Sequence, residues 1–166
     1  MLVYHPAFDI YNCAFRMLQL LNNMKGKEIE LDRIRIWDFY LAFPNEARKI
    51  KFPLYLLDLK KVFKNKPDNP YEDLIDPKRI AERMKPFQVS ALRYLASYGL
   101  IDNNLFLKNI IKRTEIELPK ELSIKIENIS TEKENIIKLV QGFSDLALWG
   151  IKERTGLLEF RYDKKN

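Results

Sequence analysis

Apolar side chains recur at helical spacing near the start of the chain. From about Asp9 to Met24 they follow one another at steps of three and four residues, which predicts a helix with one buried face. Gly26 is placed to end this helix. The residues of the predicted buried face are Phe8, Tyr11, Phe15, Leu18 and Leu21.

The segment from Leu31 to Phe43 predicts a second helix with a different pattern. Its apolar residues cover more than one face, so we expect a central helix that packs on two sides. Pro44 ends it because proline cannot continue the hydrogen-bond ladder. A shorter amphipathic helix is predicted over residues 54–65, and a proline-containing loop follows it.

Residues 76–113 show the clearest local pattern. Asp76 can cap a helix that begins at Pro77, and Pro86 then opens a second helix that Gly99 closes. Two short helices joined by a tight turn form a helix-turn-helix. A hairpin is predicted directly after them, with its turn at residues 102–104 between the apolar runs of residues 100–101 and 105–107. This order predicts a winged helix.

The last third of the chain is predicted to be helical and to finish in a strand. Thr131 and Glu134 have the spacing of a capping box, which favours a helix start at that point, and the buried face then continues toward Trp149. Apolar and polar residues alternate from Leu158 to Tyr162, as in a half-buried strand.

These patterns predict a mainly α fold with a small β-hairpin or sheet. A winged helix-turn-helix core would carry additional N- and C-terminal helices. The 166 residues are expected to form a single compact domain, made of N-terminal helices over 1–65, the winged-helix segment over 76–113, and C-terminal helices and a strand over 119–162.

The net charge of +6 is concentrated in one part of the chain. Residues 76–113 hold eight basic and three acidic side chains. Such a segment can bind the phosphates of nucleic acid or an acidic protein, and the sequence leaves both open. In the DNA-binding alternative the helix from Pro86 to Tyr98 enters the major groove. The candidate contacts are Lys85, Gln88, Arg93, Lys108, Lys112 and Arg113.

Residues for catalysis are scarce. His5 is the single histidine and Cys13 the single cysteine, and neither common glycine-rich phosphate loop is present. The acidic residues of the 28–32 segment are more simply explained as a solvated helix start. We therefore expect no enzyme activity, no cofactor and no metal. His5, Trp149 and Phe160 are candidates for a protein interface instead.

The sequence also predicts the compartment. One cysteine allows no internal disulfide, no apolar run approaches the length of a membrane span, and the N-terminus lacks the pattern of a signal peptide. A cytoplasmic protein that does not enter membranes is expected.

Three stretches resemble a known family. They are HPAFD at residues 5–9, LDRIRIWDFYLAFP at 31–44 and ALRYLASYGLI at 91–101. They resemble the middle component of bacterial ABC-three-component conflict systems, which are similar to the Lamassu anti-phage defences. The resemblance covers most of the chain, and its most specific part is the stretch from Asp32 to Pro44.

The resemblance implies a subunit of a hetero-oligomer. It would bridge an SMC-like ATPase and an effector, often a nuclease, and restrain that effector until foreign DNA is sensed. No catalytic motif is carried over with it. The alternative is a free-standing winged-helix DNA-binding transcriptional regulator, in which the basic segment of residues 76–113 would bind the phosphates of DNA.

Overall fold

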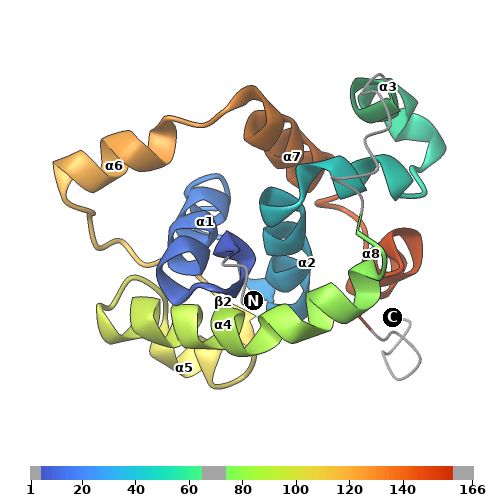
Figure 1. Cartoon of the computed structure of the whole chain (residues 1–166). Helices are drawn as coiled ribbons and strands as arrows, with labels where there is room; N and C mark the ends of the chain where they lie inside the picture. Colours follow the sequence, from blue (N-terminus) through green and yellow to red (C-terminus); the bar gives the residue numbers. More distant parts are fainter. Residues whose placement is uncertain (1–4, 65–73, 159–166) are drawn as a thin grey trace.

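The computed structural model describes residues 5–64 and 74–158 and is mainly helical (Figure 1). The short 3-10 helices are η1 (Pro6–Phe8), η2 (Pro44–Lys49) and η3 (Leu54–Leu56). The α-helices are α1 (Ile10–Asn22), α2 (Leu31–Ala42), α3 (Leu57–Lys64), α4 (Pro77–Ser97), α5 (Asn103–Phe106), α6 (Lys120–Glu127), α7 (Thr131–Gly142) and α8 (Leu148–Thr155). The strands β1 (Ile29–Glu30) and β2 (Ile110–Ile111) pair antiparallel.

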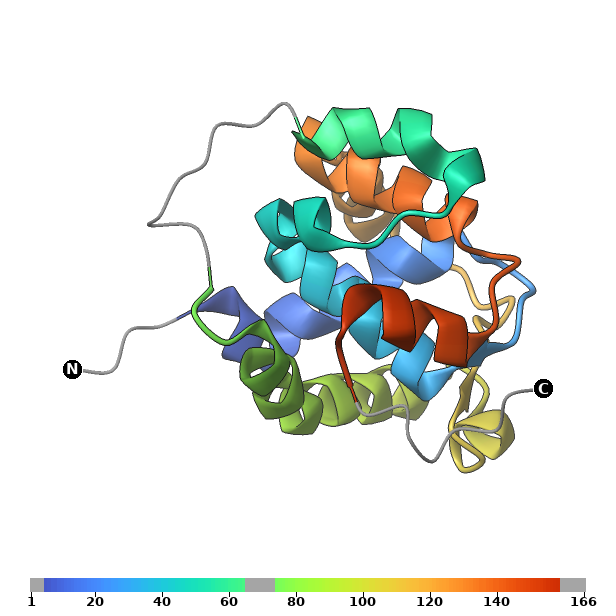
Figure 2. The same ribbon diagram turned by 90° about the vertical axis from the view of Figure 1, so that its right-hand side faces the viewer.

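Helix α2 runs through the middle of the molecule, as its two-sided apolar pattern predicts (Figure 2). All residues from Ile34 to Leu41 are buried. Helices α1, α4, α7 and α8 all contact α2. The Trp37 ring meets Phe143 of α7 edge-on, with their centroids 5.7 Å apart. The described residues thus share a hydrophobic core built around α2.

Helix α1 is confirmed, but one residue of its predicted buried face is exposed to solvent. The Asp9 carboxylate caps α1 by accepting hydrogen bonds from the backbone N–H groups of Tyr11 and Asn12, at 2.8 and 3.1 Å. Tyr11 itself is 73% exposed. A tyrosine can sit at the margin of an apolar face because its ring packs sideways while its hydroxyl stays in water.

The predicted helix-turn-helix is wrong, because residues 77–97 form the single helix α4. Proline removes one ladder hydrogen bond and clashes with the preceding turn, which usually kinks or ends a helix. Pro86 faces solvent, so the carbonyl group that loses its partner faces water. Buried residues on both sides of Pro86, including Met84 and Leu92, pack into the core and keep α4 a single continuous helix.

The predicted hairpin is wrong in its second arm, because residues 105–107 belong to α5 and the turn after it. Residues 100–102 pair instead with a second arm at residues 112–114, through a bridge between Ile101 and Arg113 and a 2.9 Å hydrogen bond from Asp102 N–H to the carbonyl oxygen of Lys112. The turn expected at 102–104 is instead the start of α5, which the Asp102 side chain caps by accepting from Leu105 N–H at 2.9 Å. The second arm continues in β2, and its partner strand is β1.

The C-terminal third differs from expectation in two places. Helix α6 lies in the 119–162 range expected to hold C-terminal helices, but α7 is capped by Ser130, whose hydroxyl accepts from Lys133 N–H at 3.3 Å, rather than by Thr131. The predicted strand at 158–162 begins with Leu158 in a left-handed conformation, with φ at +60°, which is not extended backbone. The remainder of that strand lies outside the described residues.

A cluster of buried charged and polar side chains joins α1, α2 and α4. Arg16 donates hydrogen bonds to the Asp38 carboxylate from Nε at 2.7 Å and from Nη2 at 3.2 Å. Gln88 of α4 donates from Nε2 to Asp38 Oδ2 at 2.9 Å and to the Arg35 carbonyl oxygen at 3.1 Å. Burial opposes the charge of Arg16, but Asp38 outweighs burial and raises the pKa of the guanidinium.

Within the described ranges 5–64 and 74–158, no helix has both the length and the apolar character needed to cross a lipid bilayer.

We expect Asp38→Asn to lower the free energy of unfolding by about 3–5 kcal/mol, because it leaves the buried Arg16 guanidinium without its counter-charge. Urea denaturation followed by circular dichroism measures this change. The matched control is Asp58→Asn. It makes the same substitution in a solvent-exposed ion pair with Lys61 and should leave stability unchanged. Equal midpoints for the two variants would contradict the role of Asp38.

Candidate interaction surfaces

Helix α4 is fixed so that one of its faces points outward. Arg35 of α2 donates from Nε to the side-chain oxygen of Gln88 at 2.9 Å, and Gln88 returns its hydrogen bonds to α2. The buried side of α4 also holds Ala81, Met84, Ala91, Leu92 and Leu95. Its charged residues remain in solvent. They are Lys78, Arg79, Glu82, Arg83, Lys85 and Arg93.

A groove of about 600 Å³ runs along one side of α4, between this helix and the loop that contains α5. Lys85, Val89 and Arg93 form its α4 side, and Leu107 and Asn109 lie among the residues of its opposite side. We call it the lysine groove. Its lining includes two basic residues, apolar surface, and the carboxylates of Glu30 and Asp32, which are paired with Arg33, Arg35 and Lys152. The two positive charges, which are unpaired within the described part of the chain, suit an acidic or phosphorylated partner better than a purely apolar one.

An acidic residue in the lysine groove is already neutralised. Asp32 accepts hydrogen bonds from Lys152 Nζ at 2.8 Å and from Arg35 Nη1 at 3.1 Å. Burial disfavours the charged form of Asp32, but the hydrogen bond and charge of Lys152 and the charge of Arg35 outweigh burial and lower its pKa. The Asp32 carboxylate therefore serves to anchor the buried Lys152 of α8 on α2.

A second groove, of about 460 Å³, lies between α1, α4 and the segment that leads into α6. Three tyrosines lie at it: Tyr11, Tyr94 and Tyr98. The Tyr94 ring is edge-on to both others, with centroids 5.9 Å from Tyr11 and 5.0 Å from Tyr98. A side-chain hydrogen bond with Tyr98 raises the pKa of Tyr94. We call this site the tyrosine groove.

The tyrosine groove has the chemistry of a protein interface. Its other lining residues include Phe15, Leu18, Ile116 and Leu122. Tyr98 is 62% and Ile116 51% exposed. Exposed tyrosines beside an apolar hollow are typical of binding hot spots, because each ring buries a large area at a small cost in conformational entropy.

The structure brings together three of the residues predicted to contact nucleic acid. Lys85 and Arg93 line the lysine groove, and Lys108 is exposed between two residues that line its opposite side. Gln88 does not belong with them. It is 1% exposed and fully engaged with α2, so its assignment as a contact was wrong. Gln88 is buried because it lies on the side of α4 that packs against α2.

Lys112 and Arg113 lie on the second arm of the hairpin and are half-buried. Arg113 donates to the carbonyl oxygens of Leu100, Thr114 and Ile116, at 3.2, 2.8 and 2.7 Å. Burial lowers its pKa. The guanidinium therefore ties the hairpin to the loop that borders the tyrosine groove.

The three residues proposed for a protein interface have different settings. His5 stacks on Phe43 at 4.7 Å and accepts a hydrogen bond from Ala7 N–H at Nδ1, so it holds η1 in place. Burial and the nearby Arg16 lower its pKa. Trp149 is half-buried in the first turn of α8. Phe160 lies outside the described residues.

Sequence reasoning missed the tyrosine groove and the first basic residues of α4. Tyr11 was assigned to a buried face, and Tyr98 was taken as part of a short helix. One signal could have found them: tyrosines at positions 94 and 98 are one helical turn apart, beside the predicted core positions. Arg79 and Arg83 have the same four-residue spacing, which marks one exposed face of a helix.

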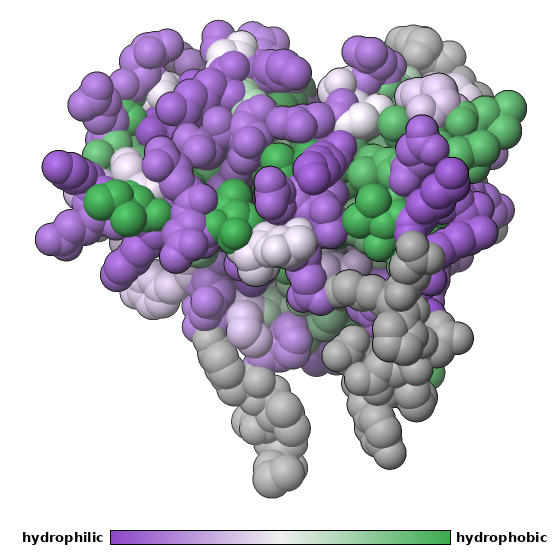
Figure 3. Space-filling view, turned by 90° about the horizontal axis from the view of Figure 1, so that it is seen from above, coloured by the Kyte–Doolittle hydropathy of each residue, from purple (hydrophilic) through white to green (hydrophobic). Residues whose placement is uncertain are grey.

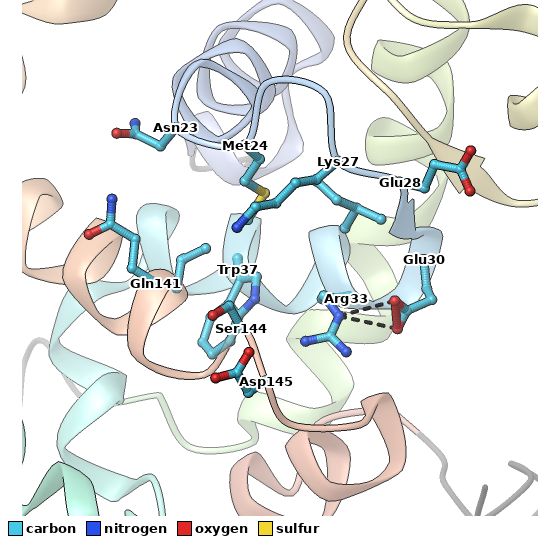
Figure 4. A pocket seen from close by; sticks show the side chains of 12 residues that line it. Asn23, Met24, Lys27, Glu28, Glu30, Arg33, Trp37, Gln141, Ser144 and Asp145 are labelled. Carbon is cyan, nitrogen blue, oxygen red and sulfur yellow. Dashed lines mark hydrogen bonds and ion pairs between the residues drawn. The ribbon is translucent and has the colours of Figure 1, made fainter.

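A third hollow, of about 410 Å³, lies above Trp37 (Figure 4). Its charged side chains have mixed signs. Arg33 is held by Glu30 at 3.1 Å and by the carbonyl oxygen of Leu146 at 2.7 Å, so its guanidinium fastens the loop after α7 to α2. Lys27, Glu28 and Asp145 line the same hollow, and the near balance of their charges favours no one class of ligand.

Within the part of the chain that the structure describes, no group of three or more His, Cys, Asp or Glu side chains could hold a metal ion. The acidic residues of the 28–32 segment are divided between separate partners: Glu30 pairs with Arg33, and Asp32 with Arg35 and Lys152.

The fold and these surfaces define a mainly helical protein in which one long, basic helix separates two surface grooves. The chain belongs to the ABC-three component (ABC-3C) system Middle Component 5 family, whose model matches residues 2–163. Membership in a multi-component system implies partner proteins. No curated protein and no solved structure gives a significant match.

Gln88→Ala should destabilise the fold by about 1–3 kcal/mol, because it leaves buried partners in α2 without their hydrogen bonds. Arg93→Ala is the matched comparison on the exposed side of the same helix and should leave stability unchanged. Chemical denaturation of both variants tests this. An unchanged midpoint for Gln88→Ala would show that the buried hydrogen bonds do not hold α4.

Proposed function

We propose that this chain is a non-catalytic adaptor subunit of a bacterial anti-phage defence complex. In this proposal it bridges an SMC-like ATPase and an effector nuclease, as in Lamassu-like systems, and restrains or licenses the effector. Membership in the Middle Component 5 family over residues 2–163 is the observation that carries the proposal. A middle component of a three-component system works through its contacts with the other components.

The tyrosine groove supports an adaptor role. It offers the rings of three tyrosines and of Phe15 together with aliphatic side chains. We assign it to a segment of another protein component that presents apolar side chains, since the groove has little charge of its own. The groove is formed by α1, α4 and the segment before α6, so an occupant would contact three parts of this chain at once.

A second exposed apolar surface lies over η3 and α3, on the right in Figure 3, where hydrophobic atoms gather at the edge of a mainly polar face. Its members are Leu54, Tyr55, Leu57 and Val62. Two separate apolar surfaces fit a subunit that contacts two partners. A free-standing DNA-binding regulator would need a base-reading helix, and one of the residues expected to contact DNA in that alternative, Gln88, is buried.

The experiment is to reconstitute the complex from this chain and the other two components of its system, and to measure binding of each component separately by calorimetry. Tyr98→Ala should weaken binding of one component by about 30-fold or more, which corresponds to a hot-spot loss of about 2 kcal/mol.

The matched control is Tyr55→Ala, because Tyr55 is 65% exposed, close to the 62% of Tyr98, and lies on η3 away from the tyrosine groove. It should leave binding of that same component unchanged. A chain that binds neither component, or variants with equal effects, would contradict the proposed use of the groove. Substrate turnover by the purified chain alone would contradict the non-catalytic role.

A further inference from the structure

On the outward face of α4, exposed basic side chains outnumber acidic ones, and they lie outside the hydrophobic core. Five basic residues are exposed along this helix, and Glu82 is the acidic residue among them. We call the five the basic ridge: Lys78, Arg79, Arg83, Lys85 and Arg93. Within the described residues none of the five forms an ion pair with a carboxylate.

The spacing of the basic ridge gives it a defined shape. At about 100° per residue, Arg79, Arg83 and Arg93 fall within about 80° of one another around the helix. Lys85 lies to one side of them, about 80° from Arg93 and about 160° from Arg83. Arg79 and Arg93 are separated by about 21 Å along the helix axis. The three arginines therefore run along the outward face of the helix, and Lys85 stands on the flank beside the lysine groove.

Short side chains alternate with the arginines on the outward face, which we call the crest. Pro86, Ser90 and Ser97 fall within about 40° of one another, in the same angular range as the arginines. Ser97 already donates its hydroxyl hydrogen bond to the Tyr94 carbonyl oxygen at 2.6 Å. Short residues on the crest leave space between the arginines, whose long side chains extend outward along the helix.

The lysine groove continues the positive surface beyond α4. Lys108 is exposed at the tip of the hairpin, across the groove from Arg93. The acidic residues between them are neutralised by other partners: Glu30 by Arg33, and Asp32 by Arg35 and Lys152. Helix α4 lies along the lower edge of the molecule in both ribbon views, where a long partner can reach it (Figures 1 and 2).

From this arrangement we infer that the basic ridge binds the sugar-phosphate backbone of double-stranded DNA, with the outward face of α4 turned into the major groove. That groove is about 12 Å wide and admits an α-helix, and its negative potential matches the row of exposed arginines and the adjacent Lys85. The deep, narrow major groove of an RNA duplex would not admit the helix. An acidic protein fits less well, because the centre of a protein interface is usually depleted of charge and the crest offers no apolar anchor.

The inferred contact is with the phosphates. The basic groups of the crest are the arginines, and Pro86, Ser90 and Ser97 lie between them. Binding energy would then come from neutralised phosphates and released counterions. This inference goes beyond the adaptor role, since it assigns to a different surface a partner that is not a protein.

The test is fluorescence anisotropy of the full chain with a labelled DNA duplex of about two helical turns, between about 50 and 200 mM salt. Arg79→Ala, Lys85→Ala and Arg93→Ala combined should weaken binding at least about tenfold at low salt. They should also reduce the slope of log affinity against log salt by about 3. Arg83 is left unchanged because its guanidinium lies 5.2 Å from the centre of the Phe8 ring.

The matched control removes three exposed lysines from α6 and α7, at the opposite side of the molecule: Lys120→Ala, Lys125→Ala and Lys138→Ala. It should keep both affinity and salt slope close to those of the natural chain. Circular dichroism establishes that both triple variants are folded. The single variant Arg93→Gln, with an expected slope change of about 1, replaces the first triple variant if that one does not fold.

Three outcomes would overturn the inference. The natural chain could fail to bind duplex DNA at about 50 mM salt, or the two triple variants could lose affinity equally, which would indicate a general charge effect. The ridge variant could also lose an acidic protein component or polyglutamate while keeping DNA. Failure of this test is separable from failure of the adaptor role, because Tyr98→Ala probes the tyrosine groove and leaves the basic ridge intact.

Discussion

The charge of Asp38 has to be balanced inside the protein, because its carboxylate is completely buried where α1, α2 and α4 meet. Arg16 supplies the counter-charge, Cys13 lies 3.5 Å away through its sulfur, and Gln88 completes the hydrogen bonds from α4. A buried carboxylate is tolerated when its acceptor positions are filled in this way. Three helices distant in sequence must therefore pack in one arrangement.

That arrangement gives the surface of the protein its two kinds of binding chemistry. Because Gln88 points inward, Arg79 and Arg93 of the same helix point outward, and α4 becomes a charged ridge. Tyr94 and Tyr98 emerge on the side facing α1, where they form an apolar groove with Tyr11. Membership in a multi-component system implies partner proteins, and α4 here borders two chemically different grooves.

The helices near the N-terminus could be predicted because their patterns are local and strong. The two-sided apolar pattern of residues 31–43 identified α2 as central, and Asp9 with its following helix was recognised from spacing. Local rules failed where tertiary packing outweighed them. Pro86 is a good signal for a helix start, yet the buried residues on either side keep α4 continuous. Asp102 suits a turn and a helix cap equally, and here it caps α5.

The sequence by itself determined that the chain is mainly helical, that α2 is its centre, and that positive charge is concentrated between residues 76 and 113. It also identified the ABC-three component middle components as the family that the chain resembles. Only the tertiary structure decided which polar residues face water. Gln88 and Arg93 look equally available in the sequence, but their positions around α4 differ by more than a quarter turn, so packing on α2 buries one and exposes the other.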